Sequence, residues 1–190
     1  MDVPVDANVE DKERDSSPSA SLFKLLKFPA GGRLERQAID KSYIVFYLSG
    51  HTMFVCNNSR VKRLSEGMAF LIPKHACVYG MSLTDSEYLL CEIPDEFEER
   101  DRPYLHSLSE EIPEDFEYDF NTVQIVPIVE KYILGMKYAI ETGFTSEYYQ
   151  QMKRRELFYY SMECYDPKEM AAFMYPLKGC EKLCRRHAFL

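Results

Sequence analysis

Short runs of apolar residues, each bounded by turn-forming residues, follow one another through the first half of the chain. The runs are rich in Val, Ile, Phe, Tyr and Thr, a composition that favours β-strands. We predict strands at Tyr43–Leu48, Thr52–Val55, Val61–Leu64, Met68–Ile72, Cys77–Met81 and Tyr88–Ile93. Strands this close together indicate a sandwich or a small barrel rather than βαβ units.

The strand Tyr43–Leu48 is apolar on both of its faces. Side chains alternate along a strand, so Val45 and Tyr47 lie on one face and Ile44 and Phe46 on the other. We expect one face to meet the barrel interior and the other to be covered by a helix or by a second chain.

The last third of the chain has the spacing of amphipathic helices. The first predicted helix carries apolar residues three and four positions apart, which form one face: Val126, Val129, Ile133, Met136 and Ile140. A second helix is predicted over Ser146–Cys164. A third begins with Asp166 as its N-cap and Pro167 in its first turn, and it ends before Pro176. The last segment, Gly179–Leu190, is predicted to be a partial fourth helix.

A strongly acidic segment separates the strands from the helices. Glu92–Asp119 contains twelve of the 31 acidic residues but only two arginines, and we interpret it as an exposed connector with short helical pieces. The formal net charge of −8 argues against a chain that binds nucleic acid over its whole surface. The basic cluster Lys153–Arg155 is interpreted as a solvated helix face.

These patterns divide the chain into four parts. We predict a disordered leader at 1–20, a β-barrel at 21–95, an acidic connector at 96–121 and a helical region at 122–190. The longest uninterrupted apolar run, Tyr43–Leu48, is far shorter than the roughly 20 residues of a membrane-spanning helix. The acidic N-terminus lacks the apolar region of a signal peptide, so we predict a cytoplasmic protein whose six cysteines are free thiols.

The sequence contains none of the common catalytic motifs. It has no glycine-rich phosphate loop, no nucleophile elbow and no His-Glu-x-x-His. Cys180, Cys184 and His187 would share one helix face, but their spacing matches no usual zinc site, and we interpret them as part of a partly buried face. We therefore predict no metal, no cofactor, no catalytic residue and no enzymatic activity.

The stretch Gly67–Pro73 (GMAFLIP) follows a hairpin that begins at Leu48-x-Gly50. Together these features resemble the skeleton of a cupin, whose metal ligands are a His-x-His and a Glu before that hairpin and a His five residues after the proline. Here the last position is Val78, and Arg36–Lys41 ahead of the hairpin offers no histidine. The resemblance therefore implies a cupin-like fold without the metal centre of cupin enzymes.

Three stretches occur in a fixed order along the chain: Ile44–Gly50, Gly67–Pro73, and Lys153–Tyr160 running into Tyr165–Leu177. In this order they resemble the N-terminal sensor and dimerisation region of AraC-type transcriptional regulators, and the resemblance covers roughly residues 22–190. It implies a mainly β fold with α, in which a cupin-like jelly-roll β-barrel is followed by an α-helical hairpin and a short helix.

The same resemblance implies a function. We predict the ligand-sensing and dimerisation region of an AraC-type transcription factor, which forms a homodimer and responds to a small-molecule effector. The helix-turn-helix part of such regulators is absent from this chain, so DNA contact is expected only through a further C-terminal segment. The alternative is a stand-alone small-molecule-binding cupin without metal or catalysis.

Aromatic residues are frequent in the predicted strands, and an aromatic-lined barrel interior could hold a small ligand. The candidate ligand-binding residues are Tyr43, Met53, Phe70, Ile72, Tyr79 and Tyr88. The alternative is that these side chains fill the barrel themselves.

The first predicted helix has more apolar positions than one small barrel can cover. The candidate dimer-interface residues on it are Val129, Ile133, Leu134, Met136 and Tyr138. An antiparallel helix of a second copy would cover the surplus. The alternative is that the second helix, Ser146–Cys164, covers it within one chain.

Overall fold

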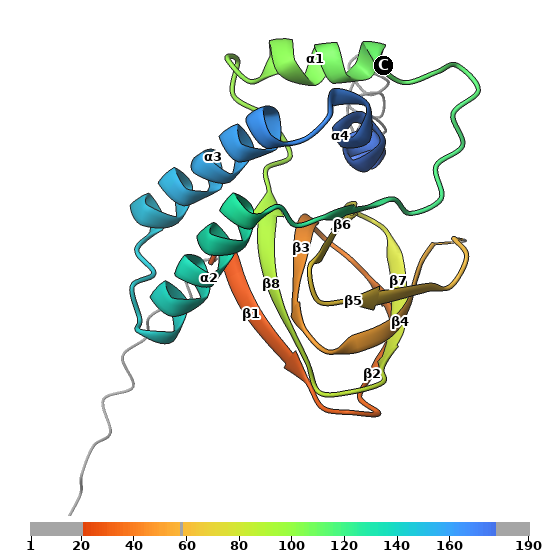
Figure 1. Ribbon diagram of the computed structural model, residues 1–190, viewed down its shortest axis with the longest axis vertical. Coiled ribbons are helices and arrows are strands. Elements are labelled where there is room, and N and C mark those ends of the chain that lie inside the picture. Colours follow the sequence, from red (N-terminus) through yellow and green to blue (C-terminus); the bar gives the residue numbers. More distant parts are fainter. Residues whose placement is uncertain (1–20, 58, 178–190) are drawn as a thin grey trace, which may run out of the picture.

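Two antiparallel sheets face each other and form a barrel-like sandwich (Figure 1). The computed structural model describes residues 21–57 and 59–177. The strands are β1 (Phe23–Phe28), β2 (Arg33–Ala38), β3 (Ser42–Ser49), β4 (His51–Cys56), β5 (Lys62–Ser65), β6 (Met68–Ile72), β7 (Cys77–Ser82), β8 (Ser86–Ile93) and β9 (Thr122–Gln124). One sheet has the order β1-β8-β3-β6-β9 and the other the order β2-β7-β4-β5.

The strand order is that of a jelly roll. The first strand pairs with the eighth, the second with the seventh, the third with the sixth and the fourth with the fifth, and every pair is antiparallel. Successive pairs alternate between the two sheets, as they do when one long hairpin is rolled up into a sandwich. This order confirms the predicted jelly roll, and the helices that follow confirm the mainly β class with α.

All six predicted strands are present, but three further strands were not individually predicted. The strands β1 and β2 lie at sheet edges, and β9 adds only three residues to the edge beside β6. An edge strand needs fewer apolar residues, and charged ones protect it from pairing with other chains. The sequences FKLLKF and RLERQA therefore lack the apolar run that reveals a central strand.

Gly50 is required by the tight turn between β3 and β4. Its φ of +94° is one that residues with a side chain rarely adopt. A Cβ at this position would also lie 2.3 Å from the carbonyl oxygen of Asp85. The glycine therefore lets the β3–β4 hairpin pack directly against the start of β8.

The helices are α1 (Arg102–Glu110), α2 (Pro127–Glu141), α3 (Glu147–Cys164) and α4 (Pro167–Met174), followed by a 3-10 turn at Tyr175–Leu177. The three predicted helices are thus confirmed, and Asp166 caps α4 by accepting hydrogen bonds from the N–H groups of Lys168 and Glu169. None of the helices within the described ranges has the length and apolar character needed to cross a bilayer. The predicted leader and the predicted helix Gly179–Leu190 lie outside the described residues.

The segment predicted as an exposed acidic connector contributes to the core. Its helix α1 buries Leu108, and Phe120 is only 1% exposed. Strand β9 follows it directly, within the part predicted as the helical region 122–190 and before the helical hairpin. Charge dominates the composition of this segment, but its few apolar residues determine how it packs.

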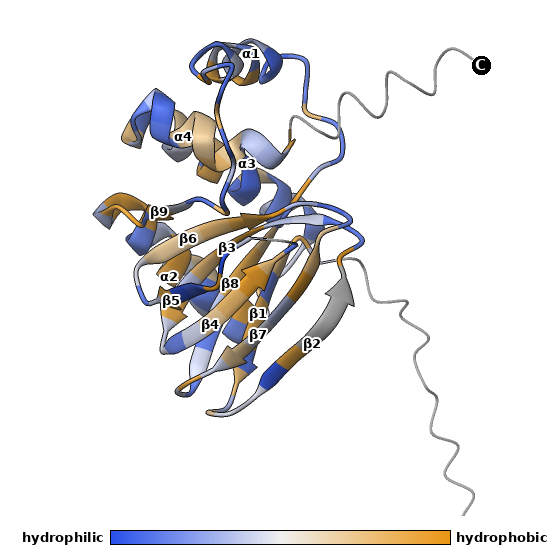
Figure 2. Cartoon of the chain, turned by 90° about the vertical axis from the view of Figure 1, so that its right-hand side faces the viewer, coloured by the Kyte–Doolittle hydropathy of each residue, from blue (hydrophilic) through white to orange (hydrophobic). Residues whose placement is uncertain are grey.

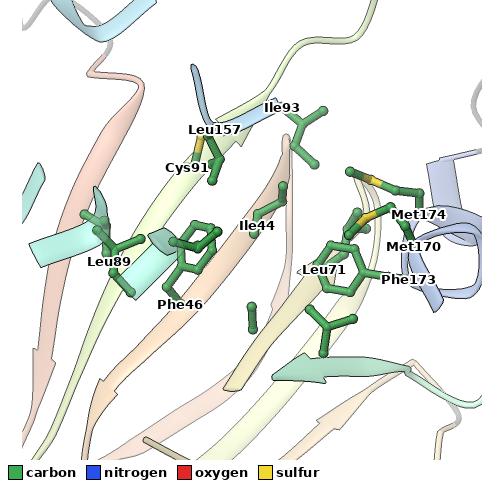
Figure 3. Packing of buried hydrophobic residues seen from close by; sticks show 14 of the residues in the cluster. Ile44, Phe46, Leu71, Leu89, Cys91, Ile93, Leu157, Met170, Phe173 and Met174 are labelled. Carbon is green, nitrogen blue, oxygen red and sulfur yellow. The ribbon is translucent and has the colours of Figure 1, made fainter. Parts of the chain in front are cut away.

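The buried residues form two clusters, one on each face of the sheet that contains β3. Val45 and Tyr47 point between the two sheets, whereas Ile44 and Phe46 point outward under the helices. Figure 3 shows this outer layer, in which Leu157 of α3 and Phe173 of α4 lie over the strands. The expectation that β3 is covered on both faces is confirmed, and the second cover is a layer of helices from the same chain.

Hydrophobic residues are concentrated in the strands of both sheets, and hydrophilic ones in the loops that connect them (Figure 2).

An ion-pair cluster holds α2 on the sheet. The Glu87 carboxylate on β8 accepts a hydrogen bond from Lys137 of α2 and lies 3.1 Å from the ammonium of Lys27 on β1. Burial opposes ionisation of Glu87, but its bonds to the two lysines outweigh burial and hold its pKa below the usual 4.5.

We expect the substitution Glu87→Gln to lower the free energy of unfolding by about 1.5–3 kcal/mol, the range for hydrogen bonds to charged groups. Because the folded-state pKa is lowered, this stabilisation is present above the unfolded pKa and is lost as the pH falls through the folded pKa. Urea unfolding at neutral pH and at about pH 3 measures both effects.

The matched control is Glu141→Gln. Glu141 is 3.9 Å from the same lysine and its side chain is 44% exposed, so its loss should cost less than about 0.5 kcal/mol. Equal losses for the two variants would show that the contact of Glu87 does not hold α2 on the sheet.

Candidate functional site

The barrel interior was the predicted ligand site, and its own side chains fill much of it. At one end, the rings of Phe54, Phe70 and Phe120 pack with centroids 5.3–5.4 Å apart. Phe70, Ile72 and Tyr88 are buried between the sheets, and Tyr43 packs partly against them. Four of the six candidate ligand-binding residues therefore face the interior, where they contribute to packing.

The other end of the interior holds a cluster of hydroxyl groups. The hydroxyls of Tyr47 and Thr52 lie 2.6 Å apart, and the Tyr88 hydroxyl lies 2.5 Å from that of Thr52. Tyr47 also donates to Ser86, 3.1 Å away. Burial raises the pKa of Tyr47 to about 12. The cluster satisfies its own hydrogen bonds, so the structure needs no ligand to pair these groups.

Met53 and Tyr79 lie on the outside of the barrel, which corrects the expectation that they face its interior. Their neighbours Thr52, Phe54 and Val78 point inward, and strand alternation turns Met53 and Tyr79 the other way. Tyr79 is 45% exposed. The sequence pattern did not reveal this because both faces of these strands carry large apolar residues.

Phe120 closes the aromatic end of the barrel from the connector. Its φ is +49°, a conformation that costs energy in a residue with a side chain and that the surrounding packing must maintain. The preceding residue, Asp119, accepts hydrogen bonds from the ammonium of Lys62 and the backbone N–H of Arg60. Nothing in the local pattern indicates this role, because Phe120 lies at the end of an acidic stretch that shows no strand or helix periodicity.

The position of the C-terminal metal-binding histidine in the cupin pattern is held by Val78, which is fully buried. Within residues 21–57 and 59–177, no three His, Cys, Asp or Glu side chains come together as metal ligands would. Cys180, Cys184 and His187 fall outside these ranges. The described interior is lined by apolar and hydroxyl side chains together with the thiol of Cys56.

A cavity of about 140 Å³ lies outside the barrel, between the end of β8, the following segment Pro94–Asp101, and α3. Its apolar lining includes Ile93, Phe97, Leu157 and Phe158. Polar and charged groups complete the lining: Glu92, Glu96, Glu98, Asp101, Gln151, Arg154, Arg155 and Ser161. The cavity thus combines apolar walls with both signs of charge.

Two arginines of α3 are the basic groups of this cavity. A guanidinium nitrogen of Arg155 lies 2.8 Å from the Glu98 carboxylate, but its buried Nε has no hydrogen-bond partner in the described structure. Arg154 forms no ion pair with the described residues. Its positive charge favours the ionised form of the buried Cys91 thiol. Burial raises the pKa of Cys91 to about 12, and Arg154 opposes this shift.

The interpretation of Lys153–Arg155 as a solvated helix face is wrong for the two arginines. Lys153 pairs with Glu156 at 2.7 Å on the α2 side of the helix. Arg154 and Arg155 line the cavity instead. Consecutive helical positions point in directions about 100° apart, so one basic cluster serves two surroundings.

The predicted dimer residues divide into two groups. Val129, Ile133 and Met136 are at most 2% exposed and pack on the sheet within one chain, which corrects their assignment to an intermolecular surface. Leu134 and Tyr138 are 52% and 70% exposed. Helix α3 therefore does not cover these two, although it does contact the buried side of α2.

Comparison with known proteins adds a likeness of fold. An RmlC-like cupin family protein from Methanocaldococcus jannaschii matches with a TM-score of 0.35 at 11% identity, over 38% of this chain and 68% of that chain. An RmlC-like cupin from Shewanella frigidimarina matches with a TM-score of 0.34 at 18% identity, over 38% of this chain and 66% of that chain. The Schizosaccharomyces pombe Cnp3 cupin domain matches with a TM-score of 0.34 at 15% identity, over 40% of this chain and 58% of that chain.

No family model and no curated protein matches the chain. These three matches cover 38–40% of this chain, and the chain spans two thirds or less of the Shewanella and Schizosaccharomyces chains. At these TM-scores the likeness carries no function. The strand order itself establishes the jelly roll.

We expect Phe120→Ala to lower the free energy of unfolding by about 3–5 kcal/mol, because it removes a buried ring and leaves a cavity among aromatic neighbours. Phe144→Ala is the control: that ring is 59% exposed, and its loss should cost about 1 kcal/mol or less. Chemical denaturation of both variants gives the comparison. Equal costs would mean that Phe120 does not seal the barrel.

Proposed function

We propose that this chain is the regulatory region of an AraC-type transcription regulator. In this proposal it pairs with a second copy through the outer face of its helical hairpin and responds to a small molecule. The observation that carries the proposal is the set of large apolar side chains that α2 and α3 leave exposed.

On α3 the exposed apolar residues form a stripe. Tyr148, Met152 and Tyr159 are 73%, 49% and 47% exposed, and their spacing of four and seven residues puts them on one helix face. Leu157 on the opposite face is buried in the core. The helix is therefore apolar on two sides, and the chain itself covers one of them.

On α2 the arrangement is similar. Leu134 and Tyr138 are one helical turn apart and exposed, whereas Ile133 and Met136 are buried under the helix. Contiguous exposed apolar surface on a folded domain is typical of an interaction site. Covering a large apolar side chain completely contributes about 1.5–3 kcal/mol, so a few of them support association.

Helix α3 connects the cavity with this exposed stripe. Arg154 and Phe158 line the cavity, and Met152 and Tyr159 are in the stripe on the same rigid helix. If α3 can take up two placements relative to the sheet, a ligand that binds more tightly to one placement would raise the population of that placement. This provides a physical route from ligand to dimer, as sensing requires.

A stand-alone small-molecule-binding cupin without catalysis is the second candidate. The cavity favours it, because a 140 Å³ cavity with apolar walls and charged groups can hold a ligand without any partner chain. The two candidates differ in whether the outer helix face is covered in solution.

The parent chain is expected to be a dimer at micromolar concentration, and the double variant Leu134→Glu, Tyr138→Glu a folded monomer. Charged groups on an apolar interface lose their hydration without gaining partners. Sedimentation or light scattering gives the mass, and circular dichroism confirms the fold.

The matched control is Val61→Glu, which adds a like charge at an apolar residue that is 58% exposed before β5. It should remain dimeric. A monomeric parent would reject dimerisation. If the double variant is folded and stays dimeric, this face of α2 is not part of the interface. The variant Met152→Glu would then test the exposed face of α3.

A further inference from the structure

The cavity beside α3 has the size of a small organic molecule. Its volume of about 140 Å³ is close to that of apolar protein cavities that hold a single benzene ring. Phe97, Leu157 and Phe158 provide apolar walls. The exposed side chains of Glu96 and Glu98 also line it, so the cavity reaches the surface between them. The apolar part of a ligand is thus limited to one ring or one short branched chain.

Two guanidinium groups at this cavity have unused hydrogen-bonding capacity. The Nε–H of Arg155 is buried without an acceptor, and Arg154 has no ion-pair partner among the described residues. Buried donors are normally paired, and those of a charged group most of all. The acceptor that best fits a guanidinium is a carboxylate, which can take two of its N–H groups at once.

The carboxylates at the same cavity argue against a simple anion. Glu92 is already paired with Lys41 at 2.7 Å and Glu98 with Arg155 at 2.8 Å, but Glu96 and Asp101 also line the cavity. Burial raises the pKa of Asp101, and the charge of Glu98 raises it further. These carboxylates would repel a ligand with only negative charge and attract an ammonium group.

We propose that this cavity binds a small apolar α-amino acid. Its carboxylate would pair with Arg154 and Arg155, and its ammonium group would lie at the acidic side near Asp101. Its side chain would pack against the rings of Phe97 and Phe158, which contact each other with centroids 6.0 Å apart. A zwitterion of this kind matches the apolar walls, the unpaired donors and the acidic rim together. The inference rests on the proposed function in that it treats the chain as a ligand-binding module, and it names the class of ligand.

The test titrates the full chain with L-leucine and with two analogues that keep its branched hydrocarbon chain. One is 4-methylpentanoate, which lacks the ammonium group, and the other is 3-methylbutylamine, which lacks the carboxylate. Calorimetry should show saturable binding of leucine, with each analogue at least tenfold weaker. Equal or tighter binding of 4-methylpentanoate would overturn the proposal in favour of a simple anion site. Absence of binding by leucine, valine and phenylalanine up to about 10 mM would overturn it altogether.

The substitution Arg154→Gln should weaken leucine binding at least tenfold. Because Arg154 forms no ion pair with the described residues, the variant should keep its fold, which circular dichroism checks. Arg63→Gln makes the same charge change at an exposed residue of β5 and should bind leucine as the parent does. If Arg154→Gln binds leucine like the parent, the carboxylate is not held there and the proposal fails.

The outcome is separable from that of the dimer. Leucine binding is measured as heat and the dimer as mass. Arg154 and Phe158 lie on a different face of α3 from the stripe, and Arg155 lies between the two surfaces. A monomer that binds leucine would reject the dimerising regulator and keep the cavity ligand. A dimer that binds no leucine would do the reverse.

Discussion

The central sheet has apolar side chains on both faces, and this constraint organises the rest of the molecule. Strand β3 directs Val45 and Tyr47 to the second sheet and Ile44 and Phe46 to the helices. Neither face can be left to water without losing much of the hydrophobic free energy of folding. The jelly roll therefore requires the helical layer for its stability, and the layer in turn determines where cavities and exposed surfaces can form.

Much of this architecture could be predicted, because its strongest signals are local. The double-sided pattern of β3, the helical spacing after residue 126 and the Asp166 cap each depend on residues that are neighbours in sequence. Edge strands β1 and β2 were not recognised, since pairing with one neighbour through backbone hydrogen bonds leaves little trace in side-chain composition. Phe120 was missed because its partners are contributed by β4 and β6, far away in the chain.

The candidate site illustrates the same limit. Aromatic residues in strands indicated a lined interior, but composition cannot distinguish side chains that surround a space from side chains that fill it. The cavity beside α3 is formed by three segments, and only their packing brings Arg154 to Phe97 and Glu96. From the sequence alone, an arginine next to another basic residue on a polar helix is expected to be solvated.

Phe120 fills the aromatic end of the barrel with a ring that belongs to the segment between β8 and β9. Phe120 lies two residues before β9, which pairs with β6 and leads directly into α2. The ring that fills the end of the barrel and the start of the helical hairpin therefore belong to one short segment of backbone, which β9 anchors to the sheet.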